Sequence, residues 1–150
     1  MKQRSWLMLC GTLTLVCCQA AVCQEPAVTG SAKAVAGVRP ATGKSRVWQV
    51  DGAERQGLVY VPETADSVPA PLVFCFHGHG GSAANAARSF RMHDEWPQAI
   101  VVYLQGLKTP GQLTDPEGKK SGWQKSAGDQ QDRDLKLFDV VLQSLRSEYR

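Results

Sequence analysis

The sequence predicts an α/β fold in which an antiparallel hairpin precedes parallel strands that alternate with helices. Three observations predict it. Two segments rich in β-branched and aromatic residues flank an Asp-Gly turn dipeptide at 51–52, the pattern of a hairpin. Two continuous apolar runs, at 72–77 and 99–104, are typical of strands buried on both faces. A helical pattern follows each run, and strands that alternate with helices form a parallel sheet.

The composition fits one globular domain with no affinity for nucleic acid. Of the 150 residues, 43% are hydrophobic and 21% are charged, and the formal net charge is +3. Lys2 and Arg4 supply two of these charges, so the rest of the chain is close to neutral. Nucleic-acid-binding domains carry a clear basic excess, and no nucleic-acid partner is therefore expected.

Residues 1–23 have the layout of a secretory signal peptide. A positively charged start is followed by a mostly apolar centre, and small residues precede two cleavage points, after Ala20 and after Cys23. The uncharged stretch 5–22 is nearly long enough to span a bilayer, but polar residues and a glycine dilute it. We expect cleavage, no stable membrane span afterwards, and a secreted or periplasmic location.

A flexible linker is predicted at 24–44, where Ala, Gly, Val and Pro occur without a sustained period. The folded domain is expected at 45–150. Of five cysteines only Cys75 lies inside it, so no disulfide framework is expected. Because Cys75 sits within an apolar run, it is interpreted as a small buried hydrophobic residue.

The hairpin is expected to pair strands at 46–50 and 57–62, with Pro62 ending the second. Its loop is left open, as either a two-residue turn or a longer loop that includes 53–56. Ser82 is expected to cap a helix that ends near Phe90. A long polar loop is predicted at 105–131.

The last predicted element is a helix from Asp132 to Tyr149. Apolar residues recur in it at spacings of three and four, which gives a broad apolar face. The predicted face consists of Leu135, Phe138, Leu142, Leu145 and Tyr149.

The segment HGHGG at 77–81 follows the first buried strand, where the reactive loops of parallel sheets lie. His77 and His79 form a His-x-His pair that suits zinc. The chain has Gly81 and Ser82, however, where such zinc motifs continue with Asp and His. A phosphate cradle is disfavoured because the lysine and the glycine spacing of nucleotide loops are absent.

An oxyanion hole fits this segment best. Acyl transfer builds negative charge on a carbonyl oxygen, and backbone N–H groups aimed at that oxygen stabilise it. Glycine lets the main chain approach without a Cβ in the way. An HG-x-GG segment after a buried strand matches the HGGG-type oxyanion loop of α/β-hydrolases.

Several segments in order resemble the N-terminal half of a secreted esterase of the polyhydroxybutyrate depolymerase and feruloyl esterase type. They are LVYVPE, PLVFCFHGHGGSAAN, AIVVYLQGL, SGWQ and GDQQDRDLKLFDVVLQSLRSEYR, and they cover about residues 46–150. The resemblance implies an α/β-hydrolase-like fold and a serine esterase without a cofactor. The implied substrate is a carboxylic ester: a polyester, a feruloylated polysaccharide or a small acyl ester.

The resemblance also implies residue roles. The backbone N–H of His79, where many members carry Cys or Thr, becomes an oxyanion donor. Gly78, Gly80 and Gly81 complete the oxyanion loop, and His77 positions it by hydrogen bonding. Trp123 and Gln124 are expected to line the substrate cleft, with a packing role as the alternative for Trp123.

The sequence departs from this family at the nucleophile. No G-x-S-x-G occurs in it, and the nearest segment, GGSAA at 80–84, has Ala84 in place of the second glycine. We therefore expect no triad residue in this chain, truncation before the nucleophile elbow, a coding sequence that continues past Arg150, and no activity from the 150 residues alone. The alternatives are a non-catalytic secreted α/β fragment or binding domain and, less favoured, a zinc hydrolase using His77 and His79.

Exported protein should begin at Ala21 or Gln24, because the small residues place cleavage after Ala20 or Cys23. Amino-terminal sequencing of secreted material measures this directly. Material that retains Met1 and stays integral to the membrane would contradict cleavage.

Overall fold

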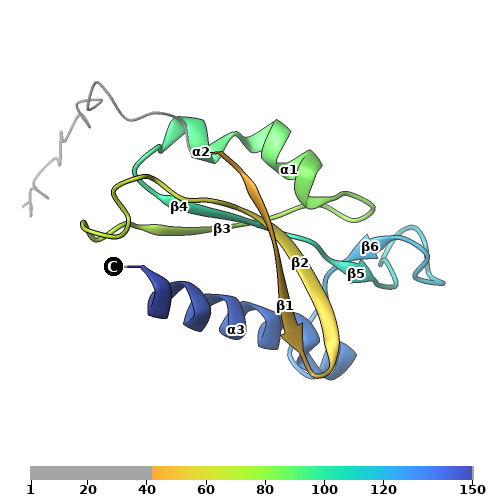
Figure 1. The fold of residues 1–150 in the computed structure, drawn as a ribbon. Coiled ribbons are helices and arrows are strands. Elements are labelled where there is room, and N and C mark those ends of the chain that lie inside the picture. Colours follow the sequence, from red (N-terminus) through yellow and green to blue (C-terminus); the bar gives the residue numbers. More distant parts are fainter. Residues whose placement is uncertain (1–41, 150) are drawn as a thin grey trace, which may run out of the picture. The chain divides into compact units, whose positions relative to one another are not determined.

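A computed structural model describes residues 42–149, so the predicted signal peptide and nearly all of the predicted linker lie outside the described range. The elements, drawn in Figure 1, are β1 Lys44–Val50, β2 Ala53–Tyr60, β3 Leu72–Phe76, α1 Ala83–Phe90, α2 Met92–Glu95, β4 Ile100–Leu104, β5 Leu107–Lys108, β6 Ser121–Gly122, the 3-10 turn η1 Asp129–Asp132, and α3 Arg133–Glu148. Within the described range, no helix is long and apolar enough to cross a membrane.

The main sheet has four strands in the order β1-β2-β4-β3. The β1–β2 and β2–β4 pairs are antiparallel, and β3 and β4 are parallel. Together with three α-helices, this mixed sheet confirms the expected combination of an antiparallel hairpin and a parallel strand pair. A small second sheet pairs β5 with β6.

The hairpin closes with the two-residue turn Asp51-Gly52, which settles the loop length that the sequence left open. Both turn residues have positive φ, 51° and 77°, as a type I′ turn requires. Residues 53–56 extend β2 and pair with 47–50 of β1.

The two predicted buried strands differ in their surroundings. Every residue of β4 is buried, because β2 and β3 flank it. The prediction that the first run is buried on both faces was wrong for β3, in which only Cys75 is buried and Phe76 is 43% exposed. Among the described residues β3 pairs only with β4, which makes it an edge strand.

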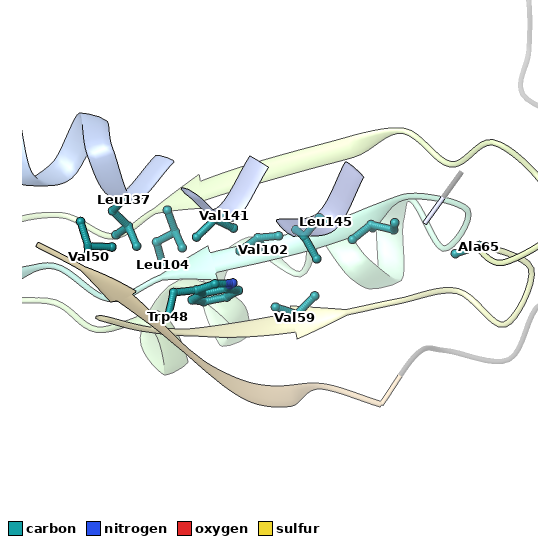
Figure 2. Packing of buried hydrophobic residues seen from close by; sticks show 10 residues of the cluster. Trp48, Val50, Val59, Ala65, Val102, Leu104, Leu137, Val141 and Leu145 are labelled. Carbon is teal, nitrogen blue, oxygen red and sulfur yellow. The ribbon is translucent and has the colours of Figure 1, made fainter. Parts of the chain in front are cut away.

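Helices cover the two faces of the sheet, with α1 and α2 on one and α3 on the other (Figure 1). Alternate residues of β4 serve the two sides: Val102 and Leu104 pack under α3, whereas Val101 and Tyr103 pack under α1. Figure 2 shows the α3 side, where helix residues meet Trp48, Val50 and Val59 of the hairpin. On the other side, alanines of α1 let that helix approach the sheet closely.

Helix α3 confirms the predicted helix, but the predicted apolar face was partly wrong. The buried residues of its apolar stripe are Leu137, Val141 and Leu145, and Leu135 is 48% exposed. The difference arises because α3 packs toward β1 and the sheet centre. The neighbouring row, Phe138, Leu142 and Tyr149, lines a groove of about 510 Å³ beside the open edge of β3.

Leu137→Ala should lower the free energy of unfolding by about 2–5 kcal/mol, since it leaves a cavity in the core. The matched change Leu135→Ala should alter it by no more than about 0.5 kcal/mol, because that side chain is largely in water. Chemical denaturation of the two variants measures both values. Equal losses would contradict the face assigned to α3.

Candidate functional site

The candidate site is the loop at 77–82, which runs from the carboxyl end of β3 into α1. Ser82 caps α1 as the sequence predicted, since its Oγ accepts the Asn85 N–H at 3.2 Å. The Gln105 side chain, just after β4, accepts the Ala83 N–H at 3.0 Å. The Gln105 bond fixes the far end of the loop to the segment that follows β4.

His77 is buried at the start of the loop, and both of its ring nitrogens are occupied. Nε2 accepts the Gly106 N–H at 3.0 Å. Because a backbone N–H only donates, Nδ1 carries the proton and donates it to the Gly78 carbonyl at 2.8 Å. The ring is neutral, and it has no free lone pair for a metal.

His77, one of the two ligands proposed for the zinc alternative, is therefore not available to bind a metal. His79 lies on the exposed part of the loop, and its ring contacts Asp115 instead of sharing a site with His77. Within residues 42–149, no group of three or more His, Cys, Asp or Glu side chains is arranged to hold a metal ion.

Three carbonyl groups of the loop, those of His77, Gly78 and Gly81, accept hydrogen bonds within the protein. The His77 carbonyl accepts the Trp123 indole N–H at 2.8 Å. The Gly78 carbonyl accepts both the His77 ring N–H and the Gly81 N–H, at 2.8 and 2.9 Å. The Gly81 carbonyl accepts the Ser121 hydroxyl, and the Ser121 carbonyl accepts the Gly80 N–H at 2.7 Å.

This arrangement turns two N–H groups outward. A trans peptide is planar, so its N–H points opposite to its carbonyl, and no described peptide bond is cis. Fixing the Gly78 carbonyl inward aims the His79 N–H away from the protein, and fixing the His77 carbonyl does the same for the Gly78 N–H. Neither N–H has an acceptor among the described residues, and both residues are exposed.

Two of the three glycines of the loop, Gly80 and Gly81, have a local physical reason to be glycine. Gly80 has a φ of +77°, which side chains rarely adopt. A Cβ on Gly81 would lie 2.9 Å from the Gly78 oxygen and 3.1 Å from the His77 Cβ. A Cβ on Gly78 would meet nothing within 4 Å, so the space beside the two outward N–H groups is open.

The His79 side chain is held to one side of the loop. Its Nε2 lies 3.2 Å from the Asp115 carboxylate, and its ring fits so closely against Gly122 that a Cβ there would lie 2.7 Å from Nδ1. Backbone N–H groups of Lys119 and Lys120, and then His79, hold the pKa of Asp115 below its ordinary value. The ionised carboxylate thus anchors the ring while the main chain of His79 stays free.

Trp123, predicted to line a cleft or to pack, and Gln124, predicted to line a cleft, have distinct positions. Trp123 packs edge-on against Phe76 with ring centres 5.0 Å apart. With His79, Leu113 and Gln124 it also lines an open cavity of about 460 Å³. The Gln124 side chain makes internal bonds, accepting the Asp134 N–H at 3.0 Å at the start of α3.

Sequence reasoning missed the residues of the predicted polar loop 105–131 that support the site. The prediction of one long polar loop was partly wrong, because the short strands β5 and β6 pair within it and bring Ser121 next to 77–81. The sequence signal for this strand pair was the glycine at 106 and at 122, where the two segments approach closely. A Cβ on Gly106 would lie 2.3 Å from the Gly122 oxygen. Glycine at both positions permits the close approach.

A scan against models of known protein families finds no match, and a search of curated proteins finds no relative.

Proposed function

We propose that residues 42–149 form the oxyanion-binding part of a secreted serine esterase with an α/β-hydrolase-like fold, acting on carboxylic esters. The observation that carries the proposal is the pair of outward, unpaired N–H groups of Gly78 and His79, held at the carboxyl end of a parallel strand. In α/β-hydrolases one oxyanion donor comes from the loop between the third strand and the following helix. The loop at 77–82 lies between β3 and α1.

The chemistry follows from the fixed direction of these N–H groups. Attack on an ester carbonyl converts its oxygen into an oxyanion, and a donor already aimed at that oxygen needs no reorganisation. Each such donor contributes about 2.7–4 kcal/mol to the transition state. The neutral His77 ring holds the loop and takes no proton from the substrate, since both of its nitrogens are engaged.

The serine nucleophile is proposed to come from outside residues 42–149. The chain contains no G-x-S-x-G. The hydroxyls of Ser82 and Ser121 are both engaged in hydrogen bonds, to the Asn85 N–H and to the Gly81 carbonyl. The open edge of β3 and the apolar groove beside it, lined by Phe74 and Phe138, suit a further strand. A further strand paired parallel to β3 would run about 4.8 Å from it, and its carboxyl end would lie beside the loop at 77–81.

A non-catalytic binding domain is the second candidate, favoured by the missing G-x-S-x-G. The same N–H groups would then bind a carboxylate or another anion without turnover. The two candidates differ in whether an ester is hydrolysed.

Gly78→Ala should lower kcat for a p-nitrophenyl ester by about a hundredfold with little change in KM, because the methyl group intrudes where the oxyanion sits. The assay uses the secreted product of the complete gene. The unfolding free energy should change by no more than about 0.5 kcal/mol, since the Cβ enters open space.

Gly81→Ala is the matched contrast, and it should lose both stability and activity because its Cβ meets the Gly78 carbonyl. An unchanged kcat in folded Gly78→Ala would remove the oxyanion assignment. A wild-type product that binds carboxylates but hydrolyses no ester would establish the binding domain instead.

A further inference from the structure

A buried ion pair joins the hairpin to the start of α3. Arg55 on β2 and Asp134 in the first turn of α3 are 1% and 7% exposed, and they meet at 2.7 Å. Arg55 also donates to the Arg133 carbonyl at 3.0 Å. Removing one partner of a buried pair leaves an uncompensated charge, so this contact fixes the helix start firmly on the sheet.

The second oxygen of Asp134 extends this contact to Gln124. It accepts the Gln124 N–H at 2.7 Å, and the Gln124 side chain in turn accepts the Asp134 N–H at 3.0 Å. The Gln124 amide also donates to Asp132 at 3.0 Å. Reciprocal bonds of this kind leave the backbone at 124 little freedom, and they determine where the preceding residue, Trp123, enters the site.

Trp123 links Gln124 to the oxyanion loop through a single hydrogen bond from its indole nitrogen. Its indole N–H donates to the His77 carbonyl at 2.8 Å, and that carbonyl receives no other hydrogen bond from the described residues. The orientation of the peptide between His77 and Gly78 therefore depends on this donor. Its ring also packs against the His77 ring, with centres 5.0 Å apart.

We infer that Trp123 is a positioning residue for the oxyanion loop and that the buried Arg55–Asp134 pair holds Trp123 in place through Gln124. The chain of contacts runs from β2 through α3 to the loop after β3. Its effect on turnover rests on the proposed function, whereas its effect on loop order does not.

The test replaces one N–H group. Trp123→Phe keeps an aromatic ring against Phe76 but removes the indole donor, and Trp96→Phe is the control because Trp96 is 43% exposed. Amide hydrogen exchange of the full chain, followed by NMR, measures how well the hydrogen bonds of the loop are protected. Unlike chemical shifts, exchange rates are not altered by the change of aromatic ring current. Exchange at Gly80 and Gly81 should accelerate about tenfold in Trp123→Phe, while Val102 in the sheet centre and the Trp96→Phe protein stay unchanged.

Asp134→Asn provides the second variant, because Asn is uncharged and has one side-chain oxygen where Asp has two, so it cannot accept at both the Arg55 and the Gln124 N–H positions. It should accelerate exchange at the same two glycines. Unchanged exchange at Gly80 and Gly81 in Trp123→Phe would overturn the positioning role, and unchanged exchange in Asp134→Asn would remove the ion pair from the inference.

Turnover separates positioning from simple support of the fold. In the product of the complete gene, Trp123→Phe should lower kcat on the order of tenfold to a hundredfold with KM unchanged, because a small misplacement of the donor is costly. A raised KM with unchanged kcat would contradict positioning. A wild type without ester turnover would overturn the proposed function, and the exchange measurements would still decide the inference.

Discussion

The site depends on the inward direction of the Gly78 carbonyl. That oxygen accepts both the His77 ring N–H and the Gly81 N–H, and the planarity of the trans peptide then forces the His79 N–H outward. The Gly106 N–H donates to Nε2 of the His77 ring, so the ring proton lies on Nδ1. Glycine at 81 follows from the same contact, because a Cβ there would collide with the fixed oxygen.

The rest of the fold holds these donors in place from several distant segments. Strand β4 is buried throughout and delivers Gln105 and Gly106 to the loop. The β5–β6 pair delivers Ser121, and Trp123 follows directly. The packed core under α3 supports this framework, whereas the β3 edge remains open among the described residues. The proposed function needs both features: a loop held in place by hydrogen bonds to supply the oxyanion donors, and an open edge at which a strand carrying the nucleophile can pair.

Features set by short stretches of sequence were predictable. A turn at Asp51-Gly52 (though not its length), the Ser82 cap and the helix of α3 all depend on neighbours within a few residues, and the structure has each of them. Features set by distant partners were not. The exposure of Leu135 depends on where α3 crosses the sheet, and the burial of Arg55 depends on Asp134, 79 positions away. The outward direction of the His79 N–H was not predictable either. It depends on which ring nitrogen of His77 carries the proton, and the distant Gly106 N–H decides that.

The most direct measurement of the central claim is amide hydrogen exchange of the wild-type loop, resolved by NMR residue by residue. The account predicts exchange near the intrinsic rate at Gly78 and His79, which have no acceptor among the described residues, and protection at Gly80 and Gly81, which are bonded to Ser121 and Gly78. Protection of His79 comparable to that of Gly81 would show that its N–H is turned inward, and it would contradict the oxyanion site.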